Sequence, residues 1–312
     1  MKEKVVIALG GNAILQPGQE ATYQNQLDNV SKCSKIIAQI VKQGYEVIVT
    51  HGNGPQVGNI LRQNEEAKDV VPPFPLDVCS AESQGFIGYM MEQTLRNELR
   101  ELGLDNSVVC MLTETVVSPE DPAFQNPTKP IGIFYSEEEA NRLAKEKGWV
   151  VAEDAGRGWR RVVPSPMPTS ILGSDVIKTL TDAGTIVIAS GGGGIPVVKK
   201  ENGTFEGIEA VIDKDRSGLK LSQEANADVF MILTDVDNVY VNYGKPDQKA
   251  LEQVSVDEVK KYVEEGQFSA GSMGPKVEGA LAFAEFGGKA IICSLAKAAE
   301  ALEGKSGTTI KK

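Results

Sequence analysis

Apolar runs alternate with helical periodicity along the chain. Short β-rich runs lie at 5–9, 45–50, 107–112, 185–190, 229–233 and 289–293. Apolar side chains at helical spacing follow the first run between Val30 and Val41, and further helices are expected from about Pro55 and over 82–102. Strands that alternate with helices are typical of an α/β protein with a mainly parallel sheet. The tail at 307–310 is expected to add an edge strand.

Residues 117–168 interrupt this alternation. The segment is rich in proline and polar residues, which neither a central strand nor a helix accepts. It also contains large apolar and aromatic side chains, which disordered segments lack. They are Phe124, Ile131, Ile133, Phe134, Tyr135, Trp149 and Trp159. We therefore expect one domain over residues 1–312 with a small protruding flap over 117–168, rather than a disordered insertion.

Composition limits the classes of partner. The net charge is −11, which argues against nucleic-acid binding because that function needs a basic surface. No apolar run approaches the roughly 20 residues of a membrane span, and no secretion signal is recognisable at the N-terminus. A cytoplasmic protein is expected. If this acidic chain binds phosphates, it must gather positive charges at the binding site.

The four cysteines and the single histidine make no recognisable zinc site and no C-x-x-C pair. No metal held by the protein itself is predicted. Cys33, Cys110 and Cys293 lie in apolar stretches and are expected to be buried reduced thiols. His51 is interpreted either as a satisfied core or turn histidine or as a contact to the acceptor, without a catalytic role.

Glycine-rich turns follow several of the predicted strands. Gly10, Gly11 and Asn12 follow the first, and Gly52, Asn53 and Gly54 follow the second. Glycines let backbone N–H groups approach an anion closely, and ligands of parallel sheets gather at this edge. A plain tight turn explains each of them almost as well. The four glycines at 191–194 fit a flexible linker poorly, and we interpret them as a backbone surface reserved for an anion.

Two lysines stand at predicted helix starts. Lys214 lies between Asp213 and Asp215. Either one aspartate caps the helix and Lys214 is solvated, or Lys214 faces a transferring phosphate while a carboxylate fixes its ammonium. Lys276, at the end of the motif 271–276, falls in a first turn, where the helix dipole disfavours a cation by about 0.3–1 kcal/mol. An anion between this ammonium and the helix would remove the penalty. Lys276 therefore indicates a phosphate site.

Together the glycine turns and lysines predict a phosphotransferase. The transition state of phosphoryl transfer spreads negative charge over oxygen atoms, so cations and N–H groups do most of the work. The chain lacks both the P-loop pattern G-x-x-x-x-G-K-[ST] and the dinucleotide pattern G-x-G-x-x-G. Direct in-line transfer between ATP and a small anionic acceptor is the expected reaction.

Longer motifs resemble the carbamate kinases, a branch of the amino-acid kinase superfamily. They are VVIALGGNA, VTHGNGPQVG, SQGFIGYMMEQ, DPAFQNPTKPIGIFY, DAGRGWRRVVPSP, GGGGIP, AVIDKD, MILTDVDNVY and AGSMGPKVEGA, in that order along nearly the whole chain. The resemblance implies a three-layer αβα sandwich with a protruding subdomain and a homodimer. It also implies Mg²⁺-ATP chemistry in which ATP and carbamate give ADP and carbamoyl phosphate, usually run toward ATP in arginine fermentation.

The resemblance further implies roles for single residues. Carbamate and the transferring phosphate would be held by Gly10, Gly11, Asn12, Gly52, Asn53 and Gly54. The transition state would be stabilised by Lys214 and Lys276, oriented by Asp215. The nucleotide site would be lined by Asp213, Asp235, Tyr240, Met273 and Gly274.

Position 8 distinguishes this branch from its relatives. Other amino-acid kinases often carry a lysine there, two residues before the first glycine pair, whereas this chain has Ala8. Lys129 in the flap resembles the residue that carbamate kinases use instead, which would make the flap a lid and Lys129 a catalytic residue. The chain departs from the family pattern at 216–218, where Gly218 is expected to weaken the helix start, and at Glu114, where Gln is common.

Other functions remain open at this point. A superfamily member acting on an amino-acid carboxylate or on UMP is disfavoured by Ala8 and by the NPTKP motif. A catalytically silent nucleotide sensor predicts the loss of Lys214, Asp215 or Lys276, and all three are present. A dinucleotide oxidoreductase would need the glycine fingerprint that is missing.

Overall fold

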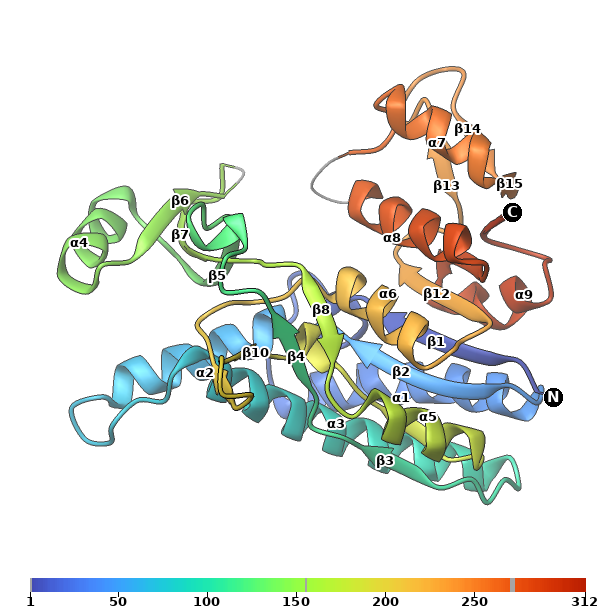
Figure 1. Cartoon of the computed structure of the whole chain (residues 1–312), viewed down its shortest axis with the longest axis horizontal. Helices are drawn as coiled ribbons and strands as arrows, with labels where there is room; N and C mark the ends of the chain where they lie inside the picture. The colour runs from blue at the N-terminus through green and yellow to red at the C-terminus, as the bar shows by residue number, and fades with distance from the viewer. Residues whose placement is uncertain (1, 155, 270–272) are drawn as a thin grey trace.

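The computed structural model of the chain describes residues 2–154, 156–269 and 273–312 (Figure 1). In this part of the chain the largest sheet has eight strands. In spatial order they are β15 (Gln253–Ser255), β17 (Thr308–Lys311), β16 (Lys289–Ser294), β12 (Val229–Thr234), β1 (Lys4–Leu9), β2 (Glu46–His51), β9 (Ile186–Ile188) and β3 (Val108–Cys110). The run from β16 to β3 is parallel throughout, which confirms the mainly parallel sheet.

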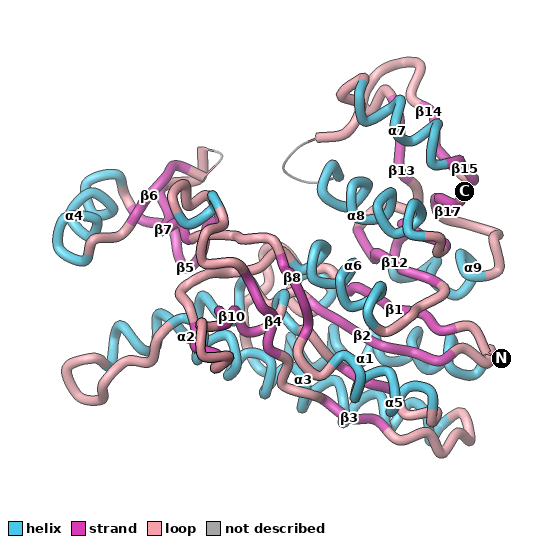
Figure 2. The backbone as a smooth tube through the Cα atoms, viewed as in Figure 1, coloured by secondary structure: helices cyan, strands magenta, loops and turns pink. Residues whose placement is uncertain are grey.

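Helices cover both faces of this sheet, because its strands are apolar on both sides. In β1, Val5, Ile7 and Leu9 pack into one hydrophobic cluster, while Val6 and Ala8 pack into another. The first cluster includes α1 (Tyr23–Lys42), α3 (Leu76–Glu101) and α9 (Ala298–Leu302). The second includes α5 (Ser174–Asp182), α6 (Lys214–Glu224), α7 (Val256–Glu264) and α8 (Met273–Phe286). The three-layer αβα sandwich is therefore confirmed, with α1 and α3 on the side opposite α6 and α8 (Figures 1 and 2).

The C-terminal tail forms a strand, but the prediction of an edge strand was wrong. Strand β17 pairs antiparallel with β16 on one side and parallel with β15 on the other. The edge is occupied by β15, whose three residues Gln253–Ser255 are too short to give a recognisable apolar run. Strand β3 is likewise shorter than the predicted run at 107–112.

Smaller elements complete the main body. A four-stranded sheet has the order β11 (Phe205–Gly207), β10 (Ile195–Lys199), β4 (Glu114–Val117) and β8 (Pro168–Ile171), and a hairpin pairs β13 (Val239–Val241) with β14 (Lys249–Leu251). Helix α2 (Gly54–Ala67) follows β2, and short 3₁₀ turns lie at η1 (Gly11–Ala13), η2 (Pro122–Phe124), η3 (Gly191–Gly193) and η4 (Leu295–Lys297). Among the helices described, none is long and apolar enough to span a membrane.

Within the flap, a separate antiparallel sheet is formed by β5 (Lys129–Tyr135), β7 (Trp159–Val163) and β6 (Val150–Glu153). Helix α4 (Glu137–Lys147) connects β5 to β6, beginning at the Ser136 hydroxyl cap and ending at Gly148 in a left-handed conformation. Figure 1 shows these elements projecting to one side of the large sheet. Ile131 and Val163 pack against α2 and the start of α3, so the flap has its own contact with the main body.

Candidate active site

A cavity of about 380 Å³ lies where the carboxyl ends of β1 and β12 meet. Residues from the first glycine turn, the end of β12 and two lysines line it, namely Gly10, Gly11, Asn12, Ala13, Leu233, Thr234, Asp235, Lys214 and Lys276. The structure thus brings together residues from four of the sequence motifs. A Cβ atom on Gly11 would meet nothing within 4 Å, so the backbone there is open to a ligand.

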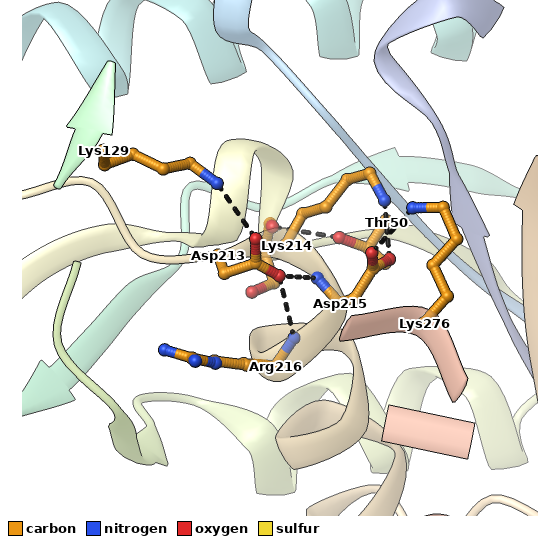
Figure 3. A network of polar contacts seen from close by, with 8 residues as sticks. Thr50, Lys129, Asp213, Lys214, Asp215, Arg216 and Lys276 are labelled. Atoms are coloured by element: carbon orange, nitrogen blue, oxygen red, sulfur yellow. Dashed lines mark hydrogen bonds and ion pairs between the residues drawn. The ribbon is translucent and has the colours of Figure 1, made fainter. Parts of the chain in front are cut away.

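Lys214 and Lys276 share the carboxylate of Asp215 (Figure 3). The ammonium of Lys214 lies 2.5 Å from Oδ1 of Asp215, and that of Lys276 lies 3.0 Å from Oδ2. The Asp215 side chain is only 4% exposed. Two cations on one buried carboxylate leave an excess of positive charge beside the glycine turn, which favours a bound anion.

One anion beside Lys276 is a side chain of the protein itself. Lys276 lies in the first turn of α8, as predicted, and its ammonium meets Asp215 of the neighbouring helix α6. The protein therefore supplies one anion that offsets the unfavourable helix dipole. Because Asp215 also serves Lys214, this carboxylate alone does not neutralise both ammonium groups.

Asp213 connects the start of α6 to the flap. Its Oδ1 accepts the backbone N–H groups of Asp215 and Arg216, so the capping interpretation is confirmed. Its Oδ2 accepts from the ammonium of Lys129, the first residue of β5, at 2.9 Å. One aspartate therefore caps the helix and another pairs with Lys214, whereas the expectation of a solvated Lys214 was wrong because its side chain is only 16% exposed.

The charges of this cluster shift its pKa values. Burial raises the pKa of Asp213, but the charges of Lys129 and Lys214 outweigh burial and lower the pKa to about 2. Burial lowers the pKa of the Lys214 ammonium, and Lys276 adds to this effect while Asp215 opposes it. Asp215 thus favours the protonated form of Lys214.

The second glycine turn packs against the first. A Cβ atom on Gly52 would lie 3.2 Å from the backbone N of Gly11 and 3.3 Å from Cδ of Lys214. Glycine at this position lets both turns and the Lys214 side chain approach one another closely. Gly54 begins α2, and a Cβ there would meet nothing within 4 Å.

Asn53 lies close to this cluster but is directed elsewhere. Its side chain is buried and donates to the Ser83 hydroxyl of α3 at 2.8 Å, and it does not cap α2. The structure gives Asn53 a role in joining α2 to α3 rather than a place in the cavity lining.

The interpretation of Gly191–Gly194 as an open anion surface was wrong. All four glycines are buried, and Gly192, Gly193 and Gly194 have positive φ. A Cβ on Gly191 would collide with His51, and Cβ atoms on the next three would collide with Asn53, Ile212 and Thr115. The run is required because other parts of the protein fill the space that side chains would need.

His51 is fully buried beside this run, with Nδ1 2.9 Å from the carbonyl oxygen of Gly52. Burial lowers its pKa from 6.5 to about 4, so the core or turn interpretation fits better than a charged contact. Because the chain has one histidine, a single imidazole signal can be followed by NMR.

We expect that imidazole signal to stay unchanged from pH 8 to 5 and to titrate near pH 4. Between pH 6.5 and 4 the unfolded chain binds a proton that the folded chain does not. The stabilisation is therefore complete above pH 6.5 and is lost as the pH falls toward 4, by about 3 kcal/mol in total. A midpoint near 6.5 in the folded protein would contradict the buried neutral state.

Only some of the predicted nucleotide-binding residues line the cavity. Asp235 lines the cavity, and its Oδ2 accepts from the Asn12 amide at 2.7 Å. Tyr240 in β13 lies 6.2 Å from Tyr243 between ring centroids, and Met273 packs against the second hydrophobic cluster. Gly274 donates its backbone N–H to the Ser269 carbonyl oxygen. Tyr240, Met273 and Gly274 are not among the lining residues. Positions 270–272 of the motif that contains Met273 and Gly274 lie outside the described residues.

Sequence reasoning missed the lining residues Gln16, Asn29 and Lys32, of which Asn29 and Lys32 belong to α1. They belong to no motif, and an exposed lysine on an amphipathic helix is ordinarily solvated. Only the packing of α1 against the first glycine turn reveals them.

The departures from the family pattern have separate explanations. A Cβ on Gly218 would lie 3.1 Å from the Phe230 ring, so glycine allows α6 to pack closely on β12. In Figure 3 the Arg216 side chain extends away from Lys214 and Lys276. Glu114 begins β4 and is exposed. None of these changes disturbs the Lys214–Asp215–Lys276 cluster.

The cysteines are free thiols. Cys33 and Cys293 are buried as predicted, and burial raises the pKa of each to about 12. Cys110 is partly buried. Its sulfur packs against Gly88 of α3, so closely that a Cβ atom on Gly88 would collide with it. These thiols are therefore protonated at neutral pH.

The amino acid kinase family model matches residues 3–294. The chain belongs to the amino acid kinase family. Within it, the chain is 57% identical to the carbamate kinase of Pyrococcus horikoshii and 51% identical to carbamate kinase 3 of Staphylococcus aureus. Each alignment covers 99% of both chains, so the resemblance to the carbamate kinases is confirmed.

Solved structures agree with this membership. The carbamate kinase of Giardia lamblia bound to AMP-PNP superposes with a TM-score of 0.94 at 49% identity, covering 100% of this chain and 99% of that one. N-acetylglutamate synthase of Neisseria gonorrhoeae superposes with a TM-score of 0.59 at 14% identity, over 99% of this chain and 59% of that one. The latter likeness concerns the fold alone.

Proposed function

We propose that the chain is a carbamate kinase, which transfers a phosphoryl group reversibly between ATP and carbamate. The observation that carries the proposal is the pair of lysines on Asp215 beside an open glycine turn, in a chain with full-length carbamate kinase relatives. That geometry suits an acceptor with no large side chain, because glycine backbone and ammonium groups suffice to hold a small anion.

In the ATP-forming direction, a terminal phosphate oxygen of ADP attacks the phosphorus of carbamoyl phosphate. The P–O bond to the carbamoyl oxygen breaks as the bond to ADP forms, and carbamate leaves with the bonding electron pair. Lys214 and Lys276 would stabilise the charge on the transferring oxygens, and Asp215 would hold both ammonium groups in position. Gly11 would let the substrate approach the backbone closely, Gly10 would hold it from the same turn, and Gly52 would act by letting the two glycine turns and Lys214 pack together.

Roles for the other predicted residues belong to the same proposal. Asn12 and Gly54 would contact carbamate or the transferring phosphate, and Asn53 would support this region through Ser83. Asp213 would act through Lys129 and the helix cap. Tyr240, Met273 and Gly274 would contact the nucleotide outside the present cavity.

Magnesium would enter with the nucleotide. Among the described residues no group of three or more His, Cys, Asp or Glu side chains could hold a metal, and Mg²⁺ commonly uses one or two carboxylates plus substrate phosphates. Asp235 lies in the cavity with an amide as its neighbour, so it fits that requirement. When bound, the ion would neutralise charge on the phosphates.

The flap (residues 117–168) is proposed as a lid that carries Lys129. Its contact with Asp213 at 2.9 Å supports this, because it joins the flap to the residue that caps the start of α6. We further propose a homodimer that works in the cytoplasm and forms ATP in arginine fermentation.

One assay tests the proposed reaction. The purified chain is mixed with Mg²⁺, ADP and carbamoyl phosphate, and ATP formation is measured, with acetyl phosphate and UMP plus ATP as competing reactions. We expect ATP formation from carbamoyl phosphate to exceed that from acetyl phosphate by at least tenfold. A preference for acetyl phosphate or UMP would reject carbamate as the acceptor, and binding of NAD(H) would point to the oxidoreductase alternative.

A further inference from the structure

The cavity has a side formed by α1, to which neither the motifs nor the family resemblance assigned a role. Asn29, Lys32 and Cys33 line it from α1. Helix α1 packs on one face of the large sheet, whereas Lys214 and Lys276 come from α6 and α8 on the other face. Cations therefore reach the first glycine turn from both helical layers.

Lys32 differs from the other two lysines of the cavity in its partners. Lys214 and Lys276 are held by Asp215, but Lys32 forms no ion pair with any carboxylate in the described ranges. Its side chain is exposed, so the ammonium is accessible to solvent and to a ligand. A cation without a carboxylate partner on the side of this cavity of about 380 Å³ is suited to a ligand oxygen.

Asn29 lies on the same side and is itself incompletely satisfied. It is 3% exposed, and its Nδ2 donates to the Gln19 side chain at 2.6 Å and to the Ile14 carbonyl oxygen at 3.2 Å. Its Oδ1 has no hydrogen-bond partner among the described residues. Since buried acceptors are normally paired, this oxygen is expected to meet an N–H or O–H donor when the cavity is occupied. An ionised phosphate oxygen only accepts hydrogen bonds, so Asn29 indicates a polar side of the cavity and is not itself a phosphate contact.

The α1 side is also attached firmly to the glycine turn. Asn29 donates to the Ile14 carbonyl oxygen, and the Cys33 thiol donates to the Ala13 carbonyl oxygen at 3.4 Å. Both acceptors directly follow the turn at Gly10–Asn12. Lys32 is therefore on a helix whose position relative to the phosphate-binding turn is fixed.

We propose that Lys32 binds a phosphoryl group of the substrates, opposite Lys214 and Lys276. The inference rests on the proposed function. The shared ligand chemistry is a phosphate oxygen, which belongs either to carbamoyl phosphate or to the nucleotide. Lys32 acts by binding and contributes to substrate affinity, because no carboxylate among the described residues holds its exposed ammonium in the fixed position that catalysis requires.

The test compares three variants in the ATP-forming assay. Lys32→Met removes the charge and keeps the aliphatic chain, and Lys32→Arg keeps the charge. Lys35→Met is the matched control, because Lys35 is also an exposed lysine of α1 but does not line the cavity. The Michaelis constants for ADP and carbamoyl phosphate are measured separately, each at two salt concentrations, together with kcat.

We expect Lys32→Met to raise one or both Michaelis constants about three- to tenfold, with kcat changed less than twofold. Lys32→Arg should restore most of the affinity, and Lys35→Met should match the unmodified chain. The salt dependence of the affected constant should become weaker in Lys32→Met. A rise for carbamoyl phosphate alone assigns Lys32 to that phosphate, and a rise for ADP alone assigns it to the nucleotide.

Calorimetric titration with ADP and with inorganic phosphate provides a readout that needs no turnover. Equal affinities for Lys32→Met and Lys35→Met in both the kinetic and the calorimetric measurements would overturn the inference. If the unmodified chain forms no ATP from carbamoyl phosphate, the proposed function fails, while weaker ADP or phosphate binding by Lys32→Met would still support the subsite.

Discussion

Replacing Asp215 with asparagine should lower kcat for ATP formation by about a thousandfold. The carboxylate holds the ammonium groups of Lys214 and Lys276 at 2.5 and 3.0 Å, and an amide of the same size offers neither the charge nor two acceptor oxygens. Positioned charge of this kind contributes the largest share of catalysis in phosphoryl transfer. The loss is measured as kcat per folded molecule, with the folded fraction determined by circular dichroism.

The same variant has a second signature in its pH profile. Burial and Lys276 lower the pKa of Lys214, and Asp215 opposes them, so the variant should lower that pKa further. Because the protonated lysine is the active form, the alkaline limb of the pH–activity profile should lie at a lower pH in the variant than in the unmodified chain. An alkaline limb at its original position, with kcat reduced less than threefold, would remove Asp215 from the mechanism.

A suitable control lies on the same helix. Glu224 accepts the Ile171 backbone N–H at 3.0 Å and pairs with Lys220 at 3.5 Å, at the opposite end of α6 from the cavity. Glu224→Gln should retain kcat within about twofold and the original alkaline limb. Equal losses in both variants would indicate general damage to α6 rather than loss of the lysine pair.

Replacing Lys129 with alanine should lower kcat a hundredfold or more while changing the affinity for ADP less than about threefold. The Lys129 ammonium reaches Asp213 from the flap, next to the start of α6, and we propose that it supplies the cation that other amino-acid kinases carry at the position of Ala8. A cation that meets the substrate mainly in the transition state affects kcat more than binding. Single-turnover kinetics and calorimetric titration with ADP separate the two effects.

Lys145→Ala provides the comparison for this flap variant. Lys145 is an exposed residue of α4 in the flap and lies outside the Asp213 contact. Its replacement should leave both kcat and ADP affinity unchanged. If Lys129→Ala behaves in the same way, Lys129 has no part in the reaction and its contact with Asp213 serves the structure alone.

Much of the architecture follows from local pattern. The run at 5–9 is apolar on both faces, and in the run at 45–50 Val47 and Val49 pack into one hydrophobic cluster while Ile48 packs into the other. Both strands must therefore be covered on both sides, and the helix between them supplies one cover. Gly44 ends α1 in a positive φ conformation that glycine adopts readily. The order of strands was harder to predict, because β17 and β15 pair through residues more than 50 positions apart. Both strands are also too short to show a clear apolar pattern in the sequence.

The sequence by itself determined the α/β class, the glycine turns at strand ends and the lysines at helix starts, because each is a short-range property of residue type and spacing. The tertiary structure alone decided which charges meet. It placed Lys214 and Lys276 on one carboxylate, joined Lys129 to Asp213, filled the space around Gly191–Gly194 with protein and directed Lys32 to the cavity. Apart from the pair of the neighbouring residues Lys214 and Asp215, these contacts join residues far apart in the chain, so they depend on how the layers pack and not on any local pattern.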